Sequence, residues 1–178
     1  NGCMLIEPGS GASLKTDLLL SAMPNPAAYV PGDISRDFLL ESATAIADRH
    51  DVEVLPVWAD FTKGHPIPAC EAVVRNRAIY FPGSTVGNFS RSDASLLLQN
   101  FASMVREESV DDQLNAEGAV VVGFDCKKDT SRMEAAYNDA EGVTAEFNYN
   151  VIDRLAQELR VSLDREKFSF RADWVEDE

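Results

Sequence analysis

The chain has 178 residues and a formal net charge of −14 at pH 7. This length is typical of one domain with a hydrophobic core of its own. The acidic balance predicts that neither nucleic acid nor an anionic membrane is a partner, because phosphate groups are bound by basic surfaces. No run of residues in the sequence is long and apolar enough to predict a membrane span.

The cysteines and histidines indicate no metal site. Cys3, Cys70 and Cys126 are far apart and odd in number, so they predict neither a disulfide framework nor a zinc site. We therefore expect a reducing, cytoplasmic setting. His50 and His65 are too few for a histidine metal cluster, and we interpret them as ordinary surface or core residues.

The first elements that the sequence predicts are a strand, a glycine turn and a helix. Residues 3–6 form a short apolar run typical of a buried strand, and Glu7 ends it. Gly9 and Gly11 then allow a sharp turn and a close approach of the backbone to a ligand. The helical pattern behind them has its inner positions at Leu14, Leu18 and Ala22. This order is typical of the first turn of a doubly wound α/β domain.

The residue spacing of the turn limits the class of ligand that it can bind. A dinucleotide site usually continues G-x-G-x-x-G or G-x-G-x-x-A, whereas the third position here is Leu14. The G-x-x-x-x-G-K-[ST] pattern of a P-loop is absent as well. An acid followed by G-x-G suits a nucleoside ligand without phosphates, S-adenosylmethionine, and Glu7 would attract its positively charged end. A plain strand-to-helix turn is the alternative.

Strands and helices then alternate, which predicts βαβ units and a parallel sheet. Further strands are expected at residues 28–30, 52–58, 78–81 and 119–124. The helix behind Ser35 has its inner positions at Phe38, Leu39, Ser42, Ala43 and Ile46. The next helix follows a capping box of Ser90 and Asp93, and its inner positions are Ala94, Leu97, Leu98, Phe101, Met104 and Val105. The acidic residues 107–118 have no apolar period and predict a flexible surface loop.

A row of polar residues follows the expected strands, at Glu7, Asp33, Asp60, Asn88 and Asp125. Ligands of open α/β sheets bind just outside the carboxyl ends of the strands. Asp33, about twenty residues beyond the glycine turn, can accept hydrogen bonds from both ribose hydroxyls. Asp60 can accept from the adenine amino group while Phe61 packs on the ring, and Asn88 lies where a methyl acceptor is expected.

Beyond Asp125 the alternation weakens. A helix is expected at residues 129–137, polar turns at 138–148, and an amphipathic helix at 150–159. The inner positions of that last helix are Val151, Ile152, Leu155 and Leu159. Residues 168–174 alternate in apolar character and predict a last strand.

Five motifs together indicate a family. They are E-P-G-S-G-A-S-L-K-T at Glu7 to Thr16, Y-V-P-G-D-I-S at Tyr29 to Ser35, A-D-F at Ala59 to Phe61, F-P-G-S-T-V-G-N-F at Phe81 to Phe89, and A-A-Y-N-D-A-E-G-V-T-A-E-F-N-Y-N at Ala135 to Asn150. Nearly the whole chain resembles the histidine Nα-methyltransferases of ergothioneine biosynthesis, close relatives of fungal tryptophan-derivative N-methyltransferases. The resemblance implies a Rossmann-like class I methyltransferase sheet with helices on both faces, a small helical insertion after the fifth strand, and no final strand.

The resemblance also implies which residues contact S-adenosylmethionine. Including Glu7, the acid that ends the first strand, the predicted cofactor-binding residues are Glu7, Gly9, Gly11, Lys15, Asp33, Asp60, Phe61 and Gly83. Gly9 and Lys15 would hold the methionine end, Asp33 the ribose, and Asp60 with Phe61 the adenine.

The implied acceptor is a small-molecule amino acid. Asn88 and Tyr137 would hold its carboxylate, Thr144 would lie in the same pocket, and Asn148 is a weaker candidate. The implied reaction methylates the α-amino group of L-histidine by direct displacement, to the trimethyl betaine hercynine, and no residue is assigned as a catalytic base. A nucleic-acid base is not the expected acceptor, because the fourth strand is followed by no Asn-Pro-Pro-aromatic motif and the chain has no Pro-Cys pair.

Two alternatives remain open at this point. One is an N-methyltransferase for a tryptophan derivative or another small amine. The other is a non-catalytic nucleotide-binding module or a NAD-type dehydrogenase core, and Leu14 argues against the dehydrogenase.

We predict three segments, a cofactor-binding core at 1–126, a substrate-binding helical insertion at 127–166, and a strand at 167–178 that returns to the core sheet. Family members carry an N-terminal segment with an acceptor-site tyrosine, and a final strand with a Glu/Ser-type side-chain selector, which this sequence lacks. We therefore expect a fragment that keeps a cofactor cleft but methylates histidine poorly. Self-association is expected through an exposed sheet edge beside residues 168–174.

Overall fold

The computed structural model describes residues 2–64, 67–106 and 118–175. The chain divides into two compact units, Asn1–Asp125 and Cys126–Glu178, and each is described by itself. The loop expected at residues 107–118 lies outside the described residues except for its last position. Among the described helices, none is both long enough and apolar enough to cross a membrane.

The first unit is built on one parallel sheet. Its strand order is β3-β2-β1-β5-β6, and β4 also pairs with β2. The strands are β1 Cys3–Pro8, β2 Ala28–Asp33, β3 Glu53–Val54, β4 Val57–Trp58, β5 Asn76–Phe81 and β6 Ala119–Val122. Every recorded pairing is parallel. The chain order reverses between β1 and β5, so the expected doubly wound α/β sheet is confirmed and its switch point lies at the end of β1.

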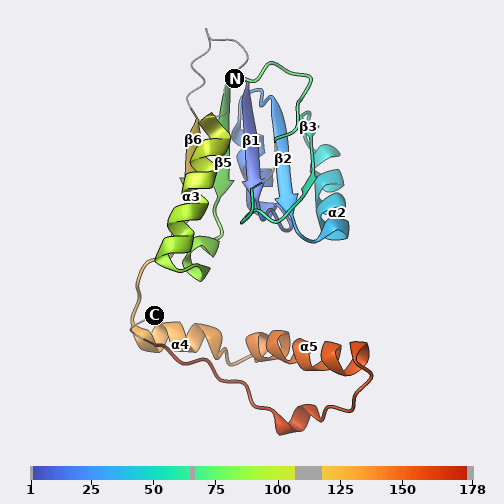
Figure 1. Ribbon diagram of the computed structural model, residues 1–178, viewed down its shortest axis with the longest axis vertical. Coiled ribbons are helices and arrows are strands. Elements are labelled where there is room, and N and C mark those ends of the chain that lie inside the picture. The colour runs from blue at the N-terminus through green and yellow to red at the C-terminus, as the bar shows by residue number, and fades with distance from the viewer. Residues whose placement is uncertain (1, 65–66, 107–117, 176–178) are drawn as a thin grey trace. The chain divides into compact units, whose positions relative to one another are not determined.

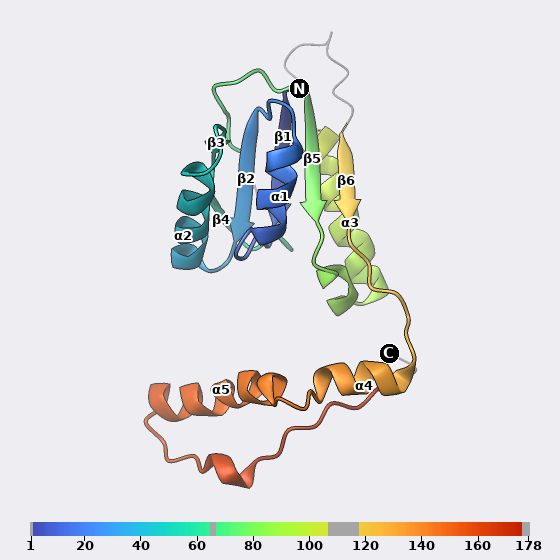
Figure 2. The same cartoon turned by 180° about the vertical axis from the view of Figure 1, so that it is seen from behind.

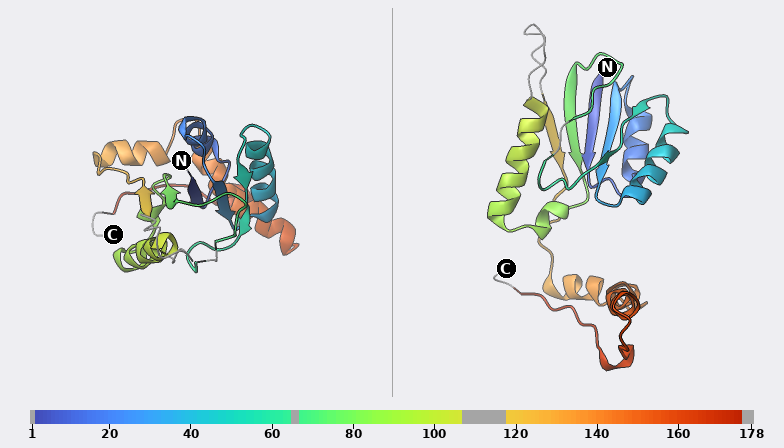
Figure 3. Two further views of the ribbon diagram at one scale, coloured as in Figure 1. Left: turned by 90° about the horizontal axis from the view of Figure 1, so that it is seen from above. Right: turned by 45° about the vertical axis from the view of Figure 1, so that its right-hand side comes forward.

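Helices cover both faces of this sheet. They are α1 Leu14–Ala22, α2 Arg36–Ala47 and α3 Arg91–Arg106, with a short 3₁₀ helix, η1 Thr85–Asn88, after β5. Figures 1 and 2 show α3 over one face and α1 over the other, and the end-on view in Figure 3 separates the two layers.

The sheet has a hydrophobic core on each face, because side chains alternate between the faces along each strand. Leu5 of β1 packs with Tyr29, Leu20 of α1 and Ile46 of α2. The residues on either side of Leu5 enter a larger core with α3, whose members include Met4, Ile6, Val30, Phe81, Phe101 and Met104. Successive side chains of a strand point to opposite faces, so one buried strand contributes to both cores.

Three helix predictions have different outcomes. The inner face of α3 is confirmed, because Leu97, Phe101, Met104 and Val105 are buried. In α2 the buried residues are Leu39, Ala43 and Ile46, while Phe38 is exposed. In α1 the expected face is wrong: Leu14 and Leu18 are 70% and 75% exposed, and Thr16 and Leu20 are buried. A shift of two positions turns a side chain by about 200° around the helix axis.

The third expected strand is interrupted rather than continuous. It appears as β3 and β4, separated by Leu55 and Pro56. Proline has no N–H to donate to a neighbouring strand. The amide of Leu55 still donates to the Tyr29 carbonyl at 2.8 Å, so both pieces stay on β2.

The second unit consists of α4 Thr130–Tyr137, α5 Val143–Glu158 and the 3₁₀ helix η2 Arg165–Lys167. Helix α4 agrees with the prediction, and Asp129 caps it by accepting from the Ser131 amide at 3.0 Å. The polar turns expected at 138–148 are confirmed at 138–142 and are wrong from Val143, where α5 begins. The carboxylate of Asp139 accepts from the amides of Val143 and Thr144, at 2.7 and 2.9 Å, which satisfies the free donors of the first turn.

The inner face expected for α5 is also wrong. Val151, Leu155 and Leu159 are exposed, and only Ile152 is half-buried. Neither α4 nor α5 has a buried residue among those described. Among the described residues of this unit, no layer of side chains covers the apolar side of α5.

Residues 168–175 form no strand, which corrects the strand expected at 168–174. Their backbone groups bond to side chains of α4 and α5 instead. The Asn138 amide pairs with both polar groups of the Ala172 backbone, at 2.8 and 2.9 Å, and the Phe170 amide donates to the Tyr149 hydroxyl at 3.0 Å. Among the described strands β6 ends the sheet, so an edge at residues 168–174 is not formed, and self-association stays a prediction.

Candidate ligand-binding site

The turn between β1 and α1 is held in a conformation that needs its glycines. Gly9 and Gly11 have φ of +67° and +52°, a region that side chains rarely adopt. A Cβ on Gly9 would also lie 3.2 Å from Cε1 of Phe61. The Ser10 amide donates to the Gly32 carbonyl at 3.0 Å, and the Gly11 amide donates to Oδ2 of Asp33 at 3.1 Å. The turn is therefore tied to the end of β2.

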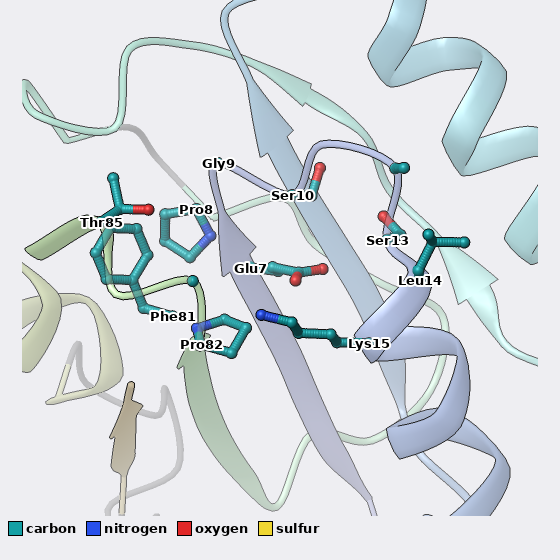
Figure 4. A pocket seen from close by; sticks show the side chains of 12 residues that line it. Glu7, Pro8, Gly9, Ser10, Ser13, Leu14, Lys15, Phe81, Pro82 and Thr85 are labelled. Carbon is teal, nitrogen blue, oxygen red and sulfur yellow. The ribbon is translucent and has the colours of Figure 1, made fainter. Parts of the chain in front are cut away.

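A pocket of about 220 Å³ lies against this turn. One wall is formed by the end of β1, the turn and the start of α1 (Figure 4). The other is formed by Phe81, the last residue of β5, and by Pro82, Gly83 and Thr85 behind it. Four of the predicted cofactor residues, Glu7, Gly9, Lys15 and Gly83, line it. The pocket lies at the carboxyl ends of β1 and β5, where ligands of this kind of sheet bind.

Glu7 is the buried acid of the pocket, with only 4% of its surface exposed. Its Oε2 accepts two hydrogen bonds, from Thr16 Oγ1 at 2.6 Å and from the Tyr29 hydroxyl at 2.5 Å. Burial raises the pKa of Glu7, and the hydrogen bonds from Thr16 and Tyr29 and the charge of Lys15 lower it in part. Figure 4 shows the Lys15 side chain extending from α1 beside the Glu7 carboxylate.

Ser10 leaves an unpaired polar atom in the same pocket. The residue is 7% exposed, and its Oγ has no hydrogen-bond partner among the described residues. A buried hydroxyl without a partner costs about 1–3 kcal/mol unless a ligand or water satisfies it. The pocket thus combines a carboxylate, an ammonium group and a free hydroxyl. These groups fit the zwitterionic amino-acid end of S-adenosylmethionine.

Asp33 stands at the end of β2 and bonds to backbone on both sides. Its Oδ2 accepts from Gly11, and its Oδ1 accepts from the Ser35 amide at 2.9 Å, just before the start of α2. Ser35 is the N-cap residue of α2, and its side chain makes no capping hydrogen bond. Each carboxylate oxygen has two lone pairs, so both can still accept from a ribose hydroxyl. The predicted ribose contact stays a prediction.

Asp60 and Phe61 follow β4. Asp60 accepts from the hydroxyl and the amide of Thr62, at 2.7 and 3.0 Å, and its Oδ2 lies 3.0 Å from Lys63 Nζ. The Thr62 and Lys63 hydrogen bonds lower the pKa of Asp60 to about 2, so the carboxylate is ionised. Phe61 packs edge-to-face on Phe81 at 5.5 Å between ring centroids, beside Gly9.

The predicted acceptor residues lie in different units. Asn88 ends η1 in the first unit and is exposed. Tyr137 ends α4 in the second unit, where it is 56% exposed and lines a cavity of about 260 Å³ with Trp174. Thr144 lies in the first turn of α5, and the weaker candidate Asn148 donates to its carbonyl at 2.8 Å. Their convergence on one pocket stays a prediction.

Sequence reasoning missed the hydroxyls around Glu7, which are those of Ser10, Ser13, Thr16 and Tyr29. All four residues are buried. Ser13 and Thr16 are polar residues at the start of α1, and Tyr29 occupies a buried strand. The signal available in the sequence was Thr16, a polar residue one helical turn after Ser13, in a helix that follows a strand ending in an acid.

Comparisons with known proteins show the family of this chain. The family described as "Histidine-specific methyltransferase, SAM-dependent" matches residues 1–178. A histidine N-alpha-methyltransferase of Mycolicibacterium smegmatis is 35% identical over 98% of this chain and 52% of its own length. The enzyme of that name from Mycobacterium tuberculosis is 33% identical over 96% of this chain and 50% of its own length.

A third relative is a longer protein. Ergothioneine biosynthesis protein 1 of Neurospora crassa is 32% identical over 84% of this chain and 17% of its own length. The chain thus spans about half the length of the two bacterial relatives and less of the fungal one. Since the family model matches the whole sequence, this chain belongs to the family of SAM-dependent, histidine-specific methyltransferases.

Proposed function

We propose that the protein transfers methyl groups from S-adenosylmethionine to the α-amino group of an amino acid, L-histidine, and that three rounds give the trimethyl betaine hercynine. Two relatives named histidine N-alpha-methyltransferase support this assignment. So does the pocket at the end of β1, which has the groups that an S-adenosylmethionine ligand requires.

The observation that carries the proposal is that one pocket contains an acidic side chain, a basic side chain and an unsatisfied hydroxyl group. Glu7 and Lys15 line the pocket, and Ser10 Oγ is buried there without a partner among the described residues. Glu7 would accept from the ammonium group of the methionine end, and Lys15 would attract its carboxylate. A phosphate group would instead meet the buried carboxylate of Glu7, which argues against a dinucleotide in this pocket.

The chain's own contribution to the reaction is alignment. S-adenosylmethionine would supply a methyl group on a cationic sulfur, which an uncharged amine can attack directly. Gly9 and Asp33 would fix the cofactor, and Asn88 with Tyr137 and Thr144 would hold the acceptor's carboxylate so that its amine faces the methyl group. Correct placement of two reactants accounts for a large share of rate enhancement in such displacements.

We also propose a reducing, cytoplasmic setting and a small-molecule acceptor rather than nucleic acid. The three free cysteines and the net charge of −14 support these proposals.

The test is methyl transfer by the full-length protein, read by mass spectrometry of the products. L-Histidine should gain up to three methyl groups, all on the α-nitrogen. Histamine, which lacks the carboxylate, should be a poor acceptor, and L-tryptophan should be poorer than L-histidine. Methylation of the imidazole ring, or a preference for a tryptophan derivative, would overturn the assignment of the acceptor.

A further inference from the structure

The start of α1 and strand β2 together surround Glu7 with hydroxyl groups. Thr16 and Tyr29 both donate to the same oxygen, Oε2. Among the residues that the structure describes, none donates to Oε1, and Glu7 lines the pocket. The carboxylate is therefore held at one oxygen and left available at the other.

A second hydroxyl fixes the direction of the Tyr29 donor. Ser13 Oγ lies 2.9 Å from the Tyr29 oxygen. A phenol has one hydrogen, so when Tyr29 donates to Glu7, Ser13 must donate to Tyr29. Burial and the neighbouring Glu7 raise the pKa of Tyr29, which keeps the phenol protonated and able to donate.

Lys15 lies beside the Glu7 carboxylate in the pocket but does not form an ion pair with it. No ion pair involving Glu7 is found among the described residues, although the residue is buried. A buried carboxylate is stabilised by a paired cation or by further hydrogen bonds. The unpaired Ser10 Oγ is an independent sign that a polar ligand completes the same pocket.

We infer that Tyr29 and Thr16 are positioning residues: they hold Oε2 of Glu7 so that Oε1 accepts a hydrogen bond from the ammonium group of an α-amino acid, the methionine end of the cofactor. This inference rests on the proposed function. A purely structural role would stabilise the buried carboxylate in the folded protein, and its loss would affect every ligand of the cleft alike. A positioning role affects only a ligand that carries the amino-acid end.

The experiment compares two ligands that differ at this end, on the full-length protein by calorimetry. S-adenosylhomocysteine carries the amino-acid end, and 5′-methylthioadenosine lacks it. Tyr29→Phe and Thr16→Val should each weaken S-adenosylhomocysteine binding by roughly tenfold or more, as expected for a lost hydrogen bond to a charged group. Binding of 5′-methylthioadenosine should change by less than about twofold, which also shows that the cleft is folded.

Matched variants separate positioning from packing. Thr16→Ser keeps the hydroxyl and should retain S-adenosylhomocysteine affinity. Tyr80 packs against the same core as Tyr29, so Tyr80→Phe should leave both ligands unaffected. Equal losses for both ligands in Tyr29→Phe, or no loss for either, would overturn the inference and leave the proposed function standing.

Two further outcomes are informative. One shows whether the ammonium group belongs to the cofactor or to the acceptor, and the other tests the proposed function itself. If Tyr29→Phe weakens L-histidine binding and spares S-adenosylhomocysteine, the ammonium group belongs to the acceptor, and the inference is wrong. A wild-type protein that binds neither adenosine ligand would overturn the proposed function and the inference with it.

Discussion

The amide of Gly11 donates a hydrogen bond of 3.1 Å to the carboxylate of Asp33. This bond joins the glycine turn after β1 to the end of β2, two places that the sequence separates by a whole helix. Asp33 also accepts from the amide of Ser35, the residue that precedes the first turn of α2. One side chain thus shapes the turn and the neighbouring strand end, where the ribose is predicted to bind.

Replacing Asp33 should weaken cofactor binding. Asp33→Ala would leave ribose hydroxyls and the Gly11 amide without an acceptor, and the loss should be about 1–3 kcal/mol of binding free energy. Calorimetry with S-adenosylhomocysteine measures it. Asp37→Ala is the control, because Asp37 is an exposed acid in the first turn of α2. Equal affinity in wild type and Asp33→Ala would rule out the ribose role.

The two glycines of the turn should respond differently to alanine. Both have positive φ, which should cost about 1–2 kcal/mol for a residue with a Cβ. Gly9→Ala should be the more damaging, because its Cβ would also meet Phe61 at 3.2 Å, whereas a Cβ on Gly11 has no neighbour within 4 Å. Thermal unfolding measures both.

Gly87 provides the control for those two variants. It lies in η1, has no positive φ recorded, and a Cβ there meets nothing within 4 Å. Gly87→Ala should unfold close to the wild-type temperature. If Gly11→Ala lowered stability as much as Gly9→Ala, the contact with Phe61 would not contribute.

The stability of the protein should depend on pH through Glu7 in the sense opposite to that of an ordinary carboxylate. Burial raises the pKa of Glu7 above its usual value of 4.5, so the folded state binds the proton more tightly than the unfolded state. The stabilising contribution of this group is present below pH 4.5 and is lost as pH rises through the raised pKa. Glu7→Gln removes the titrating group.

The measurement is the difference in free energy of unfolding between Glu7→Gln and wild type across that pH range, without ligand. The variant should gain relative to wild type as pH rises. The affinity for the cofactor should depend on pH in the opposite sense, because the ionised form of Glu7 attracts an ammonium group. In wild type the affinity should fall as the pH is lowered, and in the variant it should stay constant. A difference in stability that does not change with pH would contradict the raised pKa.

Asn88 and Tyr137 should act on the acceptor and not on the cofactor. In the full-length protein, Asn88→Ala and Tyr137→Phe should each raise the KM for L-histidine, by about tenfold for a hydrogen bond to a carboxylate, with unchanged affinity for S-adenosylhomocysteine. If the two share one ligand, the double variant should lose less than the sum of the single losses. Gln99→Ala, at an exposed position of α3, is the control. Strictly additive losses would place the two residues in separate sites.

Much of the site could be predicted from local sequence. The strand, glycine turn and helix at the start of the chain, and the acids that follow the strands, depend on interactions between residues close together in the chain. Side-chain alternation and the 3.6-residue period of α3 act over the same short range. For this reason the pocket contains Glu7 and Gly9, which the local pattern indicates, together with Lys15, which the family resemblance implies.

Only the tertiary structure decided what depends on distant partners. Glu7 is held by Thr16 and Tyr29, which stand 9 and 22 residues away in the sequence, so the buried face of α1 is set by a polar contact that no apolar period reveals. Residues 168–175 have the alternation of a strand, yet their backbone groups are satisfied by Asn138 and Tyr149. A strand needs a neighbour in a sheet, and whether that neighbour is available is a property of the folded chain and not of the segment.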